Sequence, residues 1–112
     1  MSREFNVNGH LFEVRPRTLA LGAESSLNLK KLGITMNAEA AQHETTLQMA
    51  ELGRLVLVRW VRPDGTEPMK DLNPSKAREY LKEHGGALVA ILKLAGRLSD
   101  EDAAEFEVDS GN

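Results

Sequence analysis

The sequence contains no cysteine, which excludes disulfide bonds and thiolate zinc sites and fits a reducing compartment. It also has no run of about 20 apolar residues, the length that a helix needs to cross a bilayer. Its first residues lack the apolar stretch of a signal peptide. We therefore expect a cytoplasmic protein that does not enter a membrane.

Aromatic side chains are scarce, since the 112 residues include three Phe, one Trp and one Tyr. A core must therefore be built mainly on Leu, Val and Ala, and a chain of this length fits one domain that buries about 65% of its unfolded surface. We expect residues 1–112 to form a single, mostly helical α+β domain. Residues 3–15 are expected to form an N-terminal β-hairpin, and residues 18–108 a helical body with an acidic C-terminal end.

Basic side chains are missing from residues 100–112, whereas six acids occur there: Asp100, Glu101, Asp102, Glu105, Glu107 and Asp109. The whole chain has 14 Lys and Arg against 17 Asp and Glu, so residues 1–99 carry 14 basic and 11 acidic groups, a balance of +3. An acidic end of this kind is usually solvated, but it can also contact the basic body or a basic partner.

The clearest local signal is the pair Asn8-Gly9 between two alternating runs, 3–7 and 10–15. Asn-Gly adopts the positive φ angles of a type I′ turn, which predicts a two-residue hairpin loop. The register that follows pairs Val7 with His10, Phe5 with Phe12, and Arg3 with Val14. Its apolar face must pack on other elements, because an isolated hairpin is only marginally stable.

The longest helical pattern covers residues 37–62, with Asn37 as its N-cap and no proline before Pro63. Its last part, residues 55–61, is apolar on nearly every side and rich in β-branched residues. We favour a helix through this run, and a strand over 55–61 is the alternative.

Four shorter helices are expected around this central stretch. Thr18 can cap a helix over 18–32, with Gly33 as its C′ residue, and Asn73-Pro74 reads as N-cap and N1 of a helix to residue 84. Gly85-Gly86 then introduces a break or a kink before an apolar helix over 87–97. A short acidic helix is predicted to begin at Ser99, and residues 63–72 are expected to form a turn-rich loop.

The sequence contains no motif for catalysis, phosphate binding or metal binding. His10, His43 and His84 lie on unrelated predicted elements and lack ligand spacing. We therefore expect no enzyme activity, no cofactor and no metal. Nucleic-acid binding is a weaker hypothesis, because Arg54, Arg59 and Arg62 do not share one helical stripe and the pI is about 5.6. Pairing of these arginines with Glu51 or with the acidic end explains them as well.

Apolar residues in the C-terminal half exceed what one stripe on each short helix requires. We assign a partner-binding or self-association face to Leu88, Ile91, Leu92 and Phe106. Burial of the same residues in the core is the alternative.

The order of these parts resembles small tail assembly chaperones of long-tailed bacteriophages. The resemblance rests on the segment 4–15, a Leu/Val-rich helix over 52–60, a connector, a helix followed by Leu88 to Leu94, and the acidic end. It implies a protein of the host cell cytoplasm that coats a long helical tape-measure protein and recruits tail-tube subunits, without nucleotide or catalysis. The polar stretch 42–46 and the basic body are not specially expected of that family. They keep open a small virion subunit, such as a head–tail joining, tail or decoration component.

Overall fold

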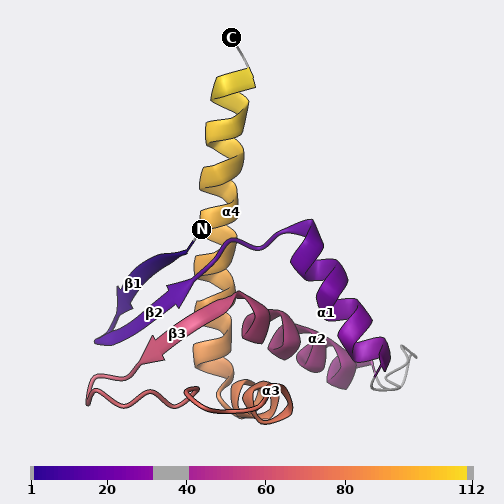
Figure 1. Ribbon diagram of the computed structural model, residues 1–112, viewed down its shortest axis with the longest axis vertical. Coiled ribbons are helices and arrows are strands. Elements are labelled where there is room, and N and C mark those ends of the chain that lie inside the picture. The colour runs from indigo at the N-terminus through magenta and orange to yellow at the C-terminus, as the bar shows by residue number, and fades with distance from the viewer. Residues whose placement is uncertain (1, 32–40, 111–112) are drawn as a thin grey trace.

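The structure, a computed structural model, describes residues 2–31 and 41–110. Its elements, in chain order, are β1 (Arg3–Val7), β2 (His10–Val14), α1 (Leu19–Lys31), α2 (Ala41–Val56), β3 (Leu57–Val61), α3 (Pro74–Glu83) and α4 (Gly85–Ser110). In Figure 1 the sheet lies to one side of the long helix α4, α1 and α2 lie to the other, and α3 lies beneath. The fold is the predicted α+β arrangement, largely helical with an N-terminal hairpin.

The hairpin has the predicted turn and register. Asn8 and Gly9 have φ angles of 51° and 86°, as a type I′ turn requires. The strands pair Val7 with His10, Phe5 with Phe12, and Arg3 with Val14. β2 then pairs antiparallel with β3, so the sheet order is β1-β2-β3.

The predicted continuation of the central helix through residues 55–61 is wrong, and the strand alternative is confirmed from Leu57 onward. α2 ends at Val56 because the chain there begins to pair with β2, which brings Trp60 opposite Phe12. Arg15 satisfies the carbonyls that the helix end leaves free: its backbone N–H donates to Val56 O (2.9 Å), and its Nε donates to Leu55 O (2.8 Å). The expected N-cap, Asn37, lies outside the described residues.

The capping predictions for α1 and α3 are confirmed. The Leu21 N–H donates to Thr18 Oγ1 (3.1 Å), and the Lys76 N–H donates to Asn73 Oδ1 (2.8 Å), with Pro74 at the first helical position. Gly33, the expected C′ residue of the first helix, lies outside the described residues.

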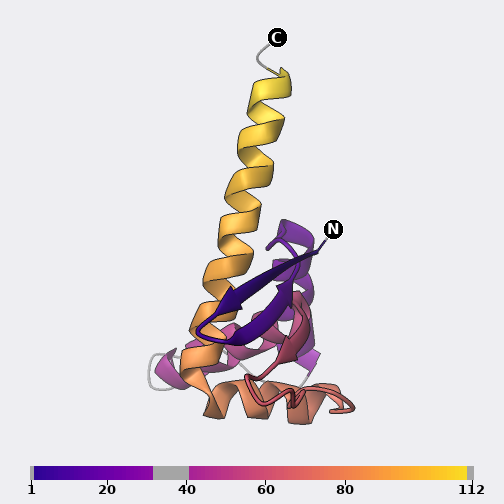
Figure 2. The ribbon, with the colours of Figure 1, turned by 90° about the vertical axis from the view of Figure 1, so that its left-hand side faces the viewer.

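Two predicted C-terminal helices are in fact one. The break falls at His84, and α4 runs without interruption to Ser110. Ser99 does not cap a new helix, because its hydroxyl donates to the carbonyls of Ala95 (3.0 Å) and Arg17 (2.6 Å). Figures 1 and 2 show that the C-terminal part of α4 projects well beyond the rest of the chain.

The sheet and the helices α2, α3 and α4 share one hydrophobic core. Its buried members are Phe12, Val14, Ala50, Val56, Trp60, Leu81, Leu88, Ile91, Leu92, Ala95 and Leu98. Helices α2 and α4 approach closely at Gly53, where a Cβ atom would lie 2.4 Å from Leu88 Cδ1. None of the helices in residues 2–31 and 41–110 combines the length and apolar character needed to cross a membrane.

Replacing Gly53 with Ala should lower the free energy of unfolding by about 1–3 kcal/mol, because the added methyl group overpacks a buried contact. The matched control is Gly22→Ala in α1, where the new Cβ meets nothing within 4 Å. That change should raise stability by about 0.5–1 kcal/mol through helix propensity. Urea unfolding followed by the fluorescence of Trp60, the single Trp, measures both. If both substitutions changed the free energy of unfolding by the same amount and in the same direction, the contact between α2 and α4 would not require a glycine at position 53.

Candidate partner-binding groove

Three of the four residues expected to bind a partner are buried. Leu88 and Ile91 are 3% and 0% exposed, and Leu92 is 8% exposed. α4 turns this stripe inward, where it packs with α2 and the sheet, so the assignment of Leu88 and Ile91 to a partner surface is corrected to a core role. Leu92 is also buried in the core, and it contributes to the lining of the groove that is described below. The Phe106 side chain lies outside the part of the chain whose side chains are described.

A surface groove is bounded by α1, α2 and α4 and has a volume of about 820 Å³. Its floor is apolar and consists of Met49 and Leu52 from α2 with Val89 and Leu92 from α4. Val89 is 40% exposed, so the floor is accessible from solvent. An accessible apolar floor between helices is typical of sites that receive a partner helix.

Helix α1 buries a serine and exposes two leucines. Its inner side carries Ser25, 5% exposed, together with Leu29, whereas Leu19 and Leu27 are 95% and 51% exposed. Leu19 and Leu27 are two helical turns apart and therefore lie on one stripe, with exposed Ala23 between them. Neither leucine lines the groove, to which α1 contributes Gly22, Ser25 and Ser26.

One end of the groove is lined by charged side chains. Arg17, Lys93 and Arg97 line it, accompanied by the acid Asp100. The backbone of Arg17 is held against α4, because its N–H donates to Ala95 O (3.4 Å) and its carbonyl accepts from Ser99 Oγ (2.6 Å). The segment that leads into α1 is therefore attached to α4.

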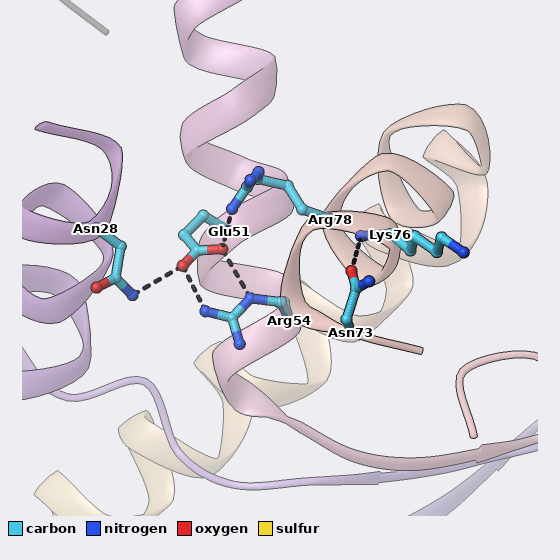
Figure 3. A network of polar contacts seen from close by, with 6 residues as sticks. All are labelled: Asn28, Glu51, Arg54, Asn73, Lys76 and Arg78. Carbon is cyan, nitrogen blue, oxygen red and sulfur yellow. Dashed lines mark hydrogen bonds and ion pairs between the residues drawn. The ribbon is translucent and has the colours of Figure 1, made fainter. Parts of the chain in front are cut away.

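A buried carboxylate fastens α1 to the rest of the helical body. Glu51 of α2 is 0% exposed and accepts hydrogen bonds from three elements (Figure 3). The donors are Asn28 Nδ2 (2.9 Å), Arg54 Nε and Nη2 (2.7 and 2.6 Å) and Arg78 Nη1 (3.1 Å). Figure 3 shows Asn28 reaching Glu51 from α1 and Arg78 from α3, so one side chain joins three helices.

This environment lowers the pKa of Glu51. Burial by itself raises the pKa of the carboxyl, but the hydrogen bonds from Arg54, Asn28 and Arg78 and the charge of Arg54 outweigh it. The group is therefore ionised in the folded protein at neutral pH. The predicted pairing of Arg54 with Glu51 is confirmed.

The other two arginines of the central segment also have partners within the fold. Arg59 Nε donates to Glu67 Oε1 (2.8 Å), and the Arg62 guanidinium lies 5.6 Å from the ring centroid of Trp60 and hydrogen-bonds the Tyr80 hydroxyl. These interactions point the three arginines toward different neighbours. They do not build the continuous cationic stripe that nucleic-acid recognition uses.

Two histidines have structural contacts. His10 Nδ1 accepts a hydrogen bond from Trp60 Nε1 (3.2 Å), and the His84 ring donates from Nδ1 to Tyr80 O (2.8 Å). Within the described ranges, no three His, Asp or Glu side chains are grouped in a way that could hold a metal ion. The groove is therefore the feature with the clearest binding geometry.

Comparison with protein families, curated proteins and solved structures finds no match to this chain. Its function must be inferred from its own surface.

Glu51→Gln should lower the free energy of unfolding at pH 7 by about 2–3 kcal/mol, because Arg54 and Arg78 lose their shared carboxylate inside the fold. The stabilisation from the ionised group is complete above about pH 4.5, the usual Glu pKa, and is lost as the pH falls through the lower folded-state pKa. Stability of the variant should therefore fall less steeply on acidification than that of the parent. Urea titrations at several pH values between neutrality and about pH 3 test both effects.

Glu67→Gln is the matched control, because Glu67 and Arg59 form an exposed pair with side chains 27% and 50% exposed. It should leave the unfolding midpoint at pH 7 nearly unchanged. If Glu67→Gln lost as much stability as Glu51→Gln, the burial of Glu51 would not explain its contribution to stability.

Proposed function

We propose that the protein is a non-catalytic assembly factor that acts like a tail assembly chaperone of long-tailed phages and shields apolar helical segments of a partner protein. The observation that carries this proposal is the groove between α1, α2 and α4 with its apolar lining of Met49, Leu52, Val89 and Leu92. The resemblance in layout supplies the biological setting, namely the host cell cytoplasm and a tape-measure or tail-tube protein as partner.

The groove suits a helix better than an extended peptide. Its floor contains Met49 and Leu52 on one helix and Val89 and Leu92 on another, so a partner helix can lay an apolar stripe between two ridges. An extended peptide would instead need a free strand edge to pair with. The groove is lined by helices, and it offers no such edge.

The energetics favour a reversible complex. Val89 in the groove is 40% exposed, so a partner can bury only part of it and gains less than the about 1.5–3 kcal/mol of a complete side-chain burial. Association costs at least several kcal/mol in lost freedom of motion, so a few anchors give binding that can be undone. A factor that releases its client during assembly requires this balance.

A small virion subunit is the second candidate. Among the described residues no strand pairs with the outer edge of β1, and a free edge can extend a sheet into a neighbouring subunit. Quantitative mass spectrometry of producing cells and of purified particles separates the two functions. A chaperone is abundant in lysate with its client and missing from particles, whereas a subunit has a fixed copy number in particles.

Val89→Asp should abolish co-purification of the helical client from producing cells, because the charge enters the apolar floor of the groove. The domain should stay folded, since Val89 is 40% exposed. Ile91→Asp cannot serve this purpose, because Ile91 is fully buried and its replacement would disrupt the core.

The matched control is Val58→Asp on β3, where the side chain is 50% exposed and lies outside the groove. Circular dichroism checks the fold of both variants. Client capture that survives Val89→Asp in a folded protein would remove the groove from the proposed function.

A further inference from the structure

We infer that β1 is a dimerisation edge, at which two copies of this chain join their sheets by antiparallel pairing of β1 with β1 around Phe5. This dimer does not depend on the groove, because it uses the backbone edge of the sheet and leaves the helical side of the molecule accessible. Three features of β1 support it: its outer edge is open, its exposed residues direct their backbone groups outward, and its sequence is complementary to itself in one register.

The two edges of the sheet differ in how they are covered. The chain returns alongside β3, where Arg59 Nε donates to Glu67 Oε1 (2.8 Å) and residues 67–70 line one hollow together with β3. Among the residues that the structure describes, no strand pairs with the other edge, which belongs to β1 (Figure 1). The N–H and C=O groups of an open edge are a template on which another strand can pair.

The hairpin turn determines which backbone groups of β1 point outward. Val7 and His10 are the first and fourth residues of the turn and form a hydrogen-bonded pair. Hydrogen-bonded and non-hydrogen-bonded pairs alternate along an antiparallel ladder, so Phe5 also bonds to β2. The N–H and C=O groups of Glu4 and Asn6 therefore point away from β2, and both residues are exposed.

These outward groups pair with a second copy of β1 in one register. With Phe5 opposite Phe5 of the second copy, Glu4 of each copy faces Asn6 of the other, and the two residues exchange both of their N–H···O bonds. Alternative registers differ by steps of two residues, because only alternate residues point outward. One step places Glu4 opposite Glu4, and like charges directly opposite destabilise a strand pair. The other step places Glu4 opposite Asn8, whose φ of 51° is not that of a strand.

The side chains of β1 are complementary in the same register. Phe5 is partly buried against the core, and the pairing brings two such rings opposite each other, an arrangement that favours strand pairing. On the other face, Asn6 Oδ1 accepts a hydrogen bond from the Gly9 N–H (3.2 Å), which leaves the NH₂ group of Asn6 to donate. The carboxylate of Glu4 from the second copy is the acceptor that lies opposite it. This match favours a second copy of the chain over an unrelated strand.

Analytical ultracentrifugation of the full chain should show a reversible dimer with a Kd of about 1–100 µM, because a small interface gives weak association. Glu4→Pro should weaken the dimer by about tenfold or more, since proline lacks the outward N–H and leaves the bonds to β2 in place. Glu4→Gln is the matched control. It keeps the N–H and a side-chain acceptor, so the Kd should change by less than about threefold. Unfolding followed by Trp60 fluorescence checks the fold of both variants.

Cysteine cross-linking tests the register, because the chain has no cysteine of its own. Residues of a hydrogen-bonded pair have Cα atoms about 5.5 Å apart, within the range of a disulfide, whereas diagonal neighbours are about 7–8 Å apart. A mixture of Glu4→Cys and Asn6→Cys chains in a glutathione redox buffer should therefore form the mixed disulfide. Each variant alone should cross-link several-fold less.

A chain that stays monomeric up to about 1 mM would leave the edge to a strand of another protein and overturn self-pairing. A dimer that a folded Glu4→Pro variant leaves unchanged would overturn the use of β1, and if the proline disturbs the strand, the cysteine mixture decides the same question. Cross-linking of the single variants as efficient as that of the mixture would overturn the register around Phe5.

Discussion

The helical body depends on one buried negative charge. Glu51 has no access to solvent, and its two oxygens are shared by groups from α1, α2 and α3. Removing a carboxylate from water is costly unless hydrogen bonds replace its hydration. Here Arg54, Arg78 and Asn28 replace it, and each of them must be in place for the charge to be tolerated. The carboxylate therefore links α1, α2 and α3 through hydrogen bonds inside the fold.

Local chemistry made much of the fold predictable from the sequence. Asn8-Gly9 and Asn73-Pro74 each require one backbone geometry, and the hairpin register and the start of α3 followed from them. The boundary at Val56–Leu57 was not predictable in this way, because no Gly or Pro marks it and the residues on both sides are apolar. The strand forms because β2 offers it a pairing partner that lies more than 40 positions earlier in the chain. Single-sequence periodicity does not detect such a long-range contact.

The groove could not be located from the sequence for a related reason. α4 is apolar on several sides, so hydrophobicity alone does not distinguish Ile91, which is buried, from Val89, which is exposed. α1 is harder still, because it buries Ser25 and exposes Leu19, the reverse of what amphipathic patterning predicts. The groove combines core residues such as Leu92 with exposed ones such as Val89, and only the packing reveals which residues line it.

The direction in which α4 leaves the body has an electrostatic consequence. The helix continues straight past the groove (Figure 2), and at 1.5 Å per residue the backbone of residues 105–109 lies about 12–18 Å along its axis from Arg97. The screening length in physiological salt is about 8 Å. The backbone of residues 105–109 therefore lies beyond one screening length from Arg97, whereas Asp100 lies among the groove residues. The straight course of α4 thus carries the end of the helix away from the groove.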